Sequence, residues 1–343
     1  MRQGEREPVE VVELNELVEE FHDLFDVRVM CHVDSRGERL PVYRIAIGNP
    51  SPAVPAAGFF GGVHGVERIG SDVVLGHLRS VATRLRWDET LHNQLATMRM
   101  VFMPIVNPGG LSRGTRCNPA GVDLMRNSPV AAREATPFLI GGQRLSARLP
   151  WYRGARDAAM QPESLALCRV VEEELLSHRF SIAVDCHSGF GLRDRIWFPY
   201  ASTRQPIAHL AEMHALAEIL DQTLLHHPYL FEPQSSQYLA HGDLWDHLYQ
   251  RACTDPQRIH LPLTLEMGSW LWIKKNPRQM LSLLGFYNPL IAHRHARVLR
   301  RQIGWLDFIG RATFGYRGWC PTGPERARHH ERALRRWYDR SRA

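Results

Sequence analysis

The sequence predicts an α/β fold, a three-layer α/β/α sandwich with a mixed, mainly parallel sheet. Short apolar runs typical of buried strands alternate along the chain with segments whose apolar residues recur at helical spacing. Such alternation is typical of a mainly parallel sheet covered by helices on both faces. At 343 residues, the chain can form one large domain or two smaller ones.

The predicted elements follow in order along the chain. A helix is expected over residues 9–25, and two alternating strands after it form a hairpin through a turn at 34–37. The part after residue 267 is predicted to be helical and basic. The strands are expected at 27–33, 41–47, 55–60, 98–106, 180–186 and 260–267, and the further helices at 69–85, 162–176 and 206–225.

Residues 107 to about 161 are rich in Gly, Pro and Arg. We predict a loop at 107–110 and little regular structure beyond it. A weakly structured stretch of this length inside a compact domain is usually functional.

The amino-acid composition limits the classes of protein to which this chain can belong. Hydrophobic residues make up 44% and charged residues 23%, as in ordinary globular proteins, and no run approaches the roughly 20 apolar residues that span a bilayer. The first residues show no secretory signal. The six cysteines form no CxxC pair, which fits a reducing compartment. We therefore expect a cytoplasmic protein with no membrane partner.

Arginines are dense from Arg294 to the end of the chain, and the formal net charge is +6. This pattern can indicate a surface for an anionic partner or a solvated helix in which acids such as Glu325 and Glu331 are interspersed. No recognisable nucleic-acid module accompanies it, so nucleic acid is not expected as a partner.

His64 and Glu67 lie where a predicted strand ends and a helix is about to begin, the usual place for ligand sites in α/β sheets. Glycines at 61, 62 and 65 permit a tight turn between them. His187 follows another predicted strand. Imidazole nitrogen and carboxylate oxygen both bind zinc, and His-Glu-His is a common ligand set of a catalytic zinc. Glu266 lies inside an apolar run, where an unpaired carboxylate would be costly.

Several blocks of the sequence resemble the zinc metallocarboxypeptidases related to carboxypeptidase A. The Asn-Pro-Gly-Gly at 107–110 is followed by Arg-Gly-Thr-Arg-Cys-Asn at 113–118 and Gly-Val-Asp-Leu-Met-Arg-Asn at 121–127. The resemblance continues through 150–154, 162–164, 185–189, 238–246 and 263–266. The blocks are most similar to small bacterial members such as the murein-peptide amidases.

The resemblance implies a role for each matching residue. One zinc ion would be held by His64, Glu67 and His187, and Asp123 would orient the first histidine. Glu266 would be the general base, Arg116 would polarise the scissile carbonyl, and Tyr238 would close over the substrate. Arg126 would bind the terminal carboxylate of a peptide or peptide-like substrate.

The sequence departs from the family at two points, and the role of a third position, Trp245, is open. Met125 replaces the usual Asn before the carboxylate-binding arginine, and methionine cannot donate a hydrogen bond. Asn127 is a candidate substitute for that contact. The interval between Asp246 and Glu266 is longer, which predicts a loop insertion at 251–257. Trp245 either shapes the substrate side-chain pocket or packs in the core.

Three units and three functions follow as expectations. Residues 1–40 would form a helix and strand packed on the core, 41–290 the catalytic domain, and 291–343 an arginine-rich helical extension. The expected function is a zinc metallopeptidase that cuts a C-terminal peptide or amide bond. The alternatives are an N-acyl amino acid deacylase of the succinylglutamate desuccinylase/aspartoacylase type and a catalytically silent zinc-fold binding protein. The sequence leaves the oligomeric state open.

Overall fold

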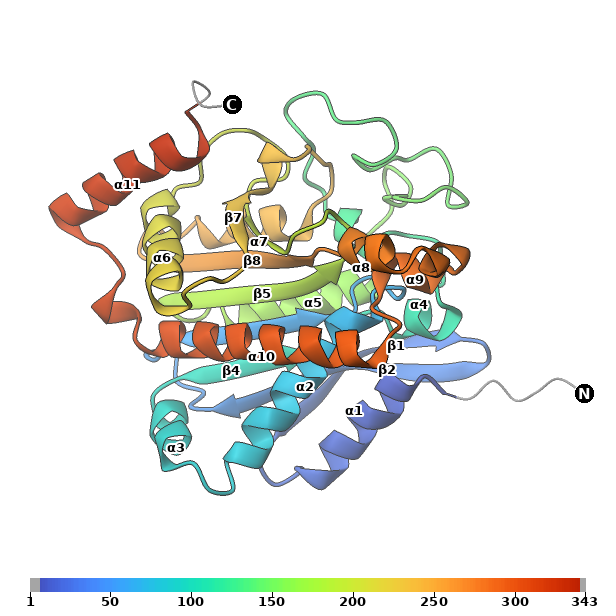
Figure 1. Ribbon diagram of the computed structural model, residues 1–343, viewed down its shortest axis with the longest axis horizontal. Coiled ribbons are helices and arrows are strands. Elements are labelled where there is room, and N and C mark those ends of the chain that lie inside the picture. Colours follow the sequence, from blue (N-terminus) through green and yellow to red (C-terminus); the bar gives the residue numbers. More distant parts are fainter. Residues whose placement is uncertain (1–6, 340–343) are drawn as a thin grey trace, which may run out of the picture.

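The computed structural model describes residues 7–339 and is built on one eight-stranded sheet (Figure 1). The strands are β1 (Asp26–Ser35), β2 (Glu38–Gly48), β3 (Ala56–Gly61), β4 (Arg99–Met103), β5 (Phe180–Ser188), β6 (Arg195–Phe198), β7 (Leu230–Pro233) and β8 (Ile259–Met267). Their order is β1-β2-β4-β3-β5-β8-β6-β7. The central strands β4, β3, β5 and β8 are parallel, whereas β2 and the pair β6–β7 run the opposite way. The predicted mixed, mainly parallel sheet is confirmed.

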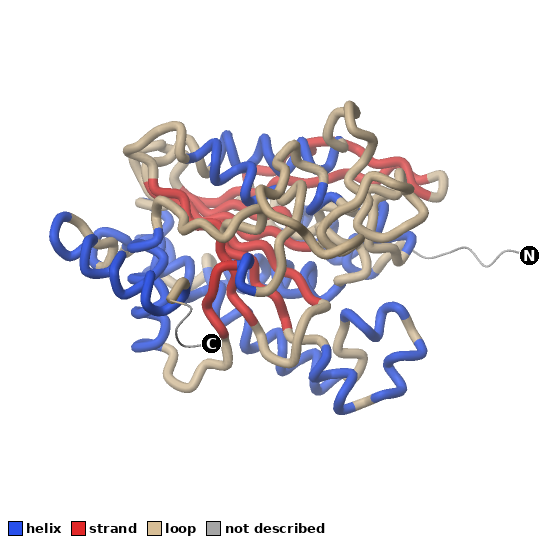
Figure 2. The backbone as a smooth tube through the Cα atoms, turned by 90° about the horizontal axis from the view of Figure 1, so that it is seen from above, coloured by secondary structure: helices blue, strands red, loops and turns tan. Residues whose placement is uncertain are grey.

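Helices cover both faces of the sheet, which Figure 2 shows as strands lying between helices. They are α1 (Val9–Glu20), α2 (Arg68–Arg84), α3 (Glu89–Ala96), α4 (Pro108–Arg113), α5 (Pro162–Glu174), α6 (Leu210–Thr223), α7 (Leu244–Ala252), α8 (Trp270–Lys275), α9 (Leu283–Tyr287), α10 (Ala292–Phe314) and α11 (Gly323–Trp337). Within the described part of the chain, none of these helices combines the length and apolar character that crossing a bilayer requires.

Two apolar clusters divide the core between the faces of the sheet. Phe59 of β3 packs in the cluster that holds α1, α2, α6 and α10, and its neighbour Phe60 packs in the cluster with α5 and α7. Every residue of β3 and β5 is buried. This two-sided burial explains why these strands are continuous apolar runs in the sequence. The predicted three-layer sandwich is therefore confirmed.

Several elements differ from the sequence predictions. The expected loop at 107–110 begins α4, because the Asn107 side chain accepts a bond from the Gly110 amide at 2.8 Å and Pro108 occupies the first turn. The four-residue strands β6 and β7 and the helices α3 and α7 were not predicted. Short elements such as these carry too little periodicity to stand out.

The remaining segments bear on the expected organisation of the chain. The β1–β2 hairpin turns at Arg36 and Gly37, and it belongs to the central sheet. The helix α10 supplies buried residues to the same core. The expected insertion at 251–257 comprises the end of α7 and the short turn before β8. The division into units at residues 40 and 290 stays a prediction.

Candidate active site

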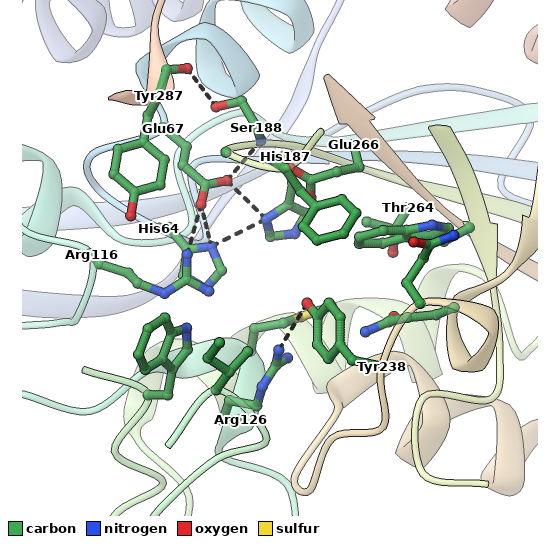
Figure 3. A pocket seen from close by; sticks show the side chains of 18 of the residues that line it. His64, Glu67, Arg116, Arg126, His187, Ser188, Tyr238, Thr264, Glu266 and Tyr287 are labelled. Carbon is green, nitrogen blue, oxygen red and sulfur yellow. Dashed lines mark hydrogen bonds and ion pairs between the residues drawn. The ribbon is translucent and has the colours of Figure 1, made fainter. Parts of the chain in front are cut away.

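The candidate site lies at the carboxyl ends of the parallel strands β3, β5 and β8. His187 on β5 is the register partner of Glu266 on β8, and the next strand, β3, ends at Gly61, just before His64. A cavity of about 430 Å³ opens at this edge, lined by both histidines, Glu67 and Glu266 (Figure 3). The sheet thus brings together residues that are up to 202 positions apart in the sequence.

The expected zinc ligands converge on one point. Glu67 Oε1 lies 2.9 Å from His64 Nδ1, and its Oε2 lies 3.1 Å from His187 Nδ1. The two Nδ1 atoms are 3.2 Å apart. One ligand atom from each residue lies within 4.8 Å of the other two. All three side chains are buried. The donor set and its spacing fit a single zinc ion.

Buried carboxylates lie behind both histidines and favour a proton on the Nε2 atom of each ring. His64 Nε2 lies 3.0 Å from Asp123 Oδ1, and His187 Nε2 lies 2.7 Å from Asp185 Oδ2. An Nε2–H that donates to a carboxylate leaves the Nδ1 lone pair free for a metal. Asp123 was singled out from the sequence, but Asp185 was not. Because side chains two apart on a strand share a face, the Asp-Cys-His order of β5 carried that signal.

Arg116 borders the ligand set. Its Nη1 donates to Glu67 Oε1 at 3.0 Å, and its Nε donates to Asp123 Oδ2 at 2.9 Å. Burial works against ionised Glu67, but His64 and His187, when protonated in the ion-free site, attract and hydrogen-bond its carboxylate and hold its pKa well below the usual range. The carboxylate is therefore ionised and available as a ligand.

Glu266 lies on β8, beside His187. Its Oε1 accepts a bond from the Phe190 amide at 3.0 Å. Burial, and then the negative charge of Glu67, raises the pKa of Glu266 to about 8. A cation held by the ligand set would lower that pKa by direct attraction. The carboxyl is thus placed and tuned to exchange protons near neutral pH.

Arg126 and Tyr238 form the opposite wall of the cavity, as Figure 3 shows. Arg126 Nη2 donates to the Tyr238 hydroxyl at 3.3 Å. The guanidinium is buried, its Nη1 lies 3.9 Å from Asp243 Oδ2, and its Nε has no partner among the described residues. A buried cation with an unused N–H group can bind a carboxylate.

Asn127, a candidate for the carboxylate contact, and Trp245, whose role was open, both lie outside the cavity lining. Asn127 does not line the cavity, because its amide donates to the Arg153 carbonyl at 2.9 Å and accepts from the Gln161 amide at 2.6 Å. Trp245 packs in the core: its indole N–H donates to Asp185 Oδ2 at 2.9 Å, and its ring contacts Phe60. Asn127 therefore holds the loop, and Trp245 buttresses the carboxylate behind His187.

Tyr287 was missed by the sequence reasoning. It ends α9, and its side chain lies beside Arg116 and Glu67 at the cavity wall (Figure 3). Ser188 Oγ donates to the Tyr287 carbonyl at 2.7 Å, which fixes this residue to the end of β5. Burial raises the pKa of the phenol, so it is a protonated donor at neutral pH. No sequence motif pointed to it, because it lies beyond the blocks that carry the resemblance.

Comparisons with known proteins agree with this geometry. A model of the zinc carboxypeptidase family matches residues 27–268, more than half of the chain. Thrombin activatable fibrinolysis inhibitor is a similar solved structure, with 18% identity, 88% of this chain and 72% of that chain covered, and a TM-score of 0.65. Carboxypeptidase A from Helicoverpa armigera is 16% identical, with 88% and 70% covered and a TM-score of 0.62. A metallo-carboxypeptidase from Burkholderia cenocepacia is 13% identical, with 88% and 69% covered and a TM-score of 0.55. At these identities the structures show a shared fold. No curated protein matches the chain.

Proposed function

Because this chain belongs to the zinc carboxypeptidase family, it is a zinc metallopeptidase, and we propose that it removes C-terminal residues from peptides or murein-derived peptides. The observation that carries the proposal is the arrangement of the cavity. The zinc-type ligand set and Glu266 lie at one side of it, and the buried cation of Arg126 lies at the other. The family membership favours this activity over the deacylase and the silent binding protein.

His64, Glu67 and His187 would hold the ion, with Asp123 and Asp185 keeping each Nδ1 unprotonated. When bound, zinc lowers the pKa of a coordinated water to about 7 and polarises the scissile carbonyl. Glu266 would take the proton of that water and later deliver it to the leaving amine. Its position on β8, beside His187, supports this role.

Arg116 would donate to the carbonyl oxygen as negative charge develops there. Its bonds to Glu67 and Asp123 hold the guanidinium in place before substrate arrives. Such prior fixing matters because a donor that needs no rearrangement stabilises the transition state most. The nearby phenol of Tyr287 supplies a second donor at the same wall.

Arg126 would bind the free C-terminal carboxylate, with Tyr238 closing over it. The unused Nε and the bond from Arg126 to the Tyr238 hydroxyl support this assignment. Binding the terminal carboxylate at a fixed distance from the ligand set would place the last peptide bond at the reacting groups. The aromatic rings of Phe190, Trp197 and Trp270 would surround the rest of the substrate.

The test compares the zinc-loaded wild type with Glu266→Gln on a mixed pool of peptides and murein peptides, analysed by mass spectrometry. We expect the wild type to trim single C-terminal residues. Glu266→Gln should keep its zinc and lose at least about 100-fold in kcat, the usual contribution of a general base. Glu163→Gln is the matched control, because Glu163 is a buried acid on α5 bonded to Asn118.

Two results would count against the proposal. Near wild-type turnover by Glu266→Gln would remove its role as the base. Cleavage of internal or γ-linked amides alone would make the enzyme an amidase and leave the carboxylate role of Arg126 without support.

A further inference from the structure

A second cluster of side chains able to bind a metal lies between α6 and α11, and one of its members, His329, lies beyond the part of the chain that the family model matches. Figure 1 shows these two helices side by side at the β7 edge of the sheet. His214 and Glu218 come from α6, and His329 comes from α11. One ligand atom from each lies within 4.8 Å of the other two. The mechanism proposed above uses none of them.

The histidine pair repeats the geometry of the candidate active site. His214 Nδ1 and His329 Nδ1 are 3.0 Å apart, compared with 3.2 Å for the corresponding atoms of His64 and His187. The ring centroids are 5.1 Å apart at an interplanar angle of 68°, compared with 4.9 Å and 61°. In both pairs the two imidazole rings are therefore steeply tilted to each other, with their Nδ1 atoms facing.

Both histidines of the second pair are buried, with 6% and 7% of their surface exposed. Two facing Nδ1 atoms can share one proton, or both lone pairs can bind one cation. Tetrahedral Zn–N bonds of about 2.0–2.1 Å place two ligand nitrogens roughly 3.3 Å apart, close to the separation found here. Burial also lowers the pKa of His214, which favours the neutral form that binds metals.

Glu218 completes the set from the solvent side. It follows His214 by one helical turn, so both side chains lie on the same face of α6. Its Oε1 accepts from Arg332 at 3.3 Å, and its Oε2 lies 3.9 Å from His329 Nε2. A ligand atom of Glu218 lies within 4.8 Å of one from each histidine, so a small side-chain rotation would let this carboxylate reach an ion held by the imidazoles. The carboxyl side chain is 35% exposed, which leaves an opening for the ion and for a water ligand.

The surroundings of α11 suggest what such an ion would do. Among its described residues, only His329 and Ala333 are buried, and Leu334 and Trp337 in its last turns are partly buried against the core. Apolar burial therefore holds the end of this helix, and its first two turns have little of it. Its arginines pair with acids of α6: Arg326 with Glu212, Arg332 with Glu218 and Arg336 with Asp221. Partly exposed pairs of this kind typically contribute little to stability.

We propose that His214, Glu218 and His329 bind a second divalent cation, with zinc preferred, which fastens α11 to α6. Two imidazoles and one carboxylate favour zinc over magnesium or calcium, which prefer oxygen ligands. No buried carboxylate is found behind these histidines among the described contacts, unlike Asp123 and Asp185 in the active site. The second ion therefore binds more weakly and is the first to leave when a chelator is added.

The experiment titrates zinc into the metal-stripped full-length protein by calorimetry. The wild type should bind two ions, the weaker of which is absent in His329→Gln. His330→Gln is the matched control, because this neighbour on α11 lies outside the cluster, and it should still bind two. A double variant, His64→Gln with His187→Gln, should keep one zinc and gain thermal stability from it. Cobalt absorbance in that double variant should report imidazole ligation.

The proposal is overturned if the wild type binds a single zinc that the double variant loses, or if His329→Gln still binds two. Far-UV circular dichroism checks that each variant folds. If His329→Gln does not fold, Glu218→Gln tests the same site with a substitution at its solvent-exposed side. It should weaken the second binding step at least tenfold, and an unchanged second step would overturn the proposal.

Discussion

Asp185 is the residue on which the geometry of the second histidine ligand depends. Its Oδ2 accepts from both His187 Nε2 and the Trp245 indole, and it is completely buried. A negative charge behind a metal-binding imidazole fixes its tautomer and raises its basicity. In the proposed site this carboxylate would act on the ion through His187 without contacting it.

Replacing Asp185 by Asn keeps the shape and removes the charge. We expect zinc affinity to fall about 10–100-fold, measured by competition with a chelator, with the fold retained. Asp246→Asn is the control, because Asp246 is equally buried but accepts from the backbone amides of Ala201 and Ser202. Equal zinc affinity in the two variants would show that Asp185 has no such role.

Met125 is the second residue whose identity has functional consequences. It lines the cavity next to Arg126, where the related carboxypeptidases usually have Asn. Met125→Asn would add a donor to the carboxylate, and a hydrogen bond to a charged group contributes roughly 1.5–3 kcal/mol. We expect the KM of peptides with a free C-terminus to fall about tenfold or more, with little effect on C-terminally amidated peptides. Met125→Leu adds no donor, so identical KM values for the two variants would contradict this role.

At the scale of elements, the backbone path of the link between β3 and α2 is determined by its close contact with α4. A Cβ built on Gly65 would lie 2.0 Å from the carbonyl carbon of Gly110 and 2.2 Å from the amide nitrogen of Leu111. Both are backbone atoms of a capped helix that cannot yield easily. The link that carries His64 and Glu67 thus runs against α4 with no room for a side chain.

We therefore expect Gly65→Ala to lower the unfolding free energy by about 1–3 kcal/mol and to weaken zinc binding, because relief of the overlap must shift the ligands. Chemical denaturation and zinc titration measure the two effects. Gly304→Ala is the control: it lies in α10 with nothing within 4 Å, so it should be neutral or slightly stabilising. A Gly65→Ala protein as stable as Gly304→Ala would mean that α4 adapts freely.

At the scale of the whole molecule, buried neutral histidines make the fold sensitive to acid. Burial lowers the pKa of His77 to about 4 and that of His260 to about 3. The unfolded chain takes up these protons as the pH falls through about 6.5, but the folded protein does not. Stability is therefore complete above pH 6.5 and declines from there down toward the folded-state values.

Each of these histidines should remove on the order of 3 kcal/mol of unfolding free energy between pH 7 and pH 4. His77→Leu should make this decline shallower, because the ring lies among Phe59 and Phe102 and its Nε2 has no partner among the described residues. Denaturant melts of metal-free protein at several pH values measure it. His22→Leu, at an exposed position, is the control. Parallel pH profiles for the two variants would refute the assignment.

Local patterns were sufficient for the main lines of the fold. The sheet type, its hairpin and its buried strands follow from periodicity, because a strand buried on both faces must be apolar throughout. The three ligand candidates and Glu266 could be found because each lies at or near the end of such a strand. Short elements such as β6 and β7 could not be predicted, since four residues carry no clear period.

Local sequence patterns indicated the fold class, the family resemblance and the ligand candidates His64, Glu67 and His187. The positions of several other side chains follow from the folded arrangement of the chain. It turned Asn127 toward a loop backbone and Trp245 into the core, and it brought Tyr287 to Arg116 and His329 to His214. The physical reason is that a side chain's environment is set by packing partners far away in the chain, 115 residues apart for the last pair. The spacing of residues within a short stretch of sequence cannot indicate such distant partners.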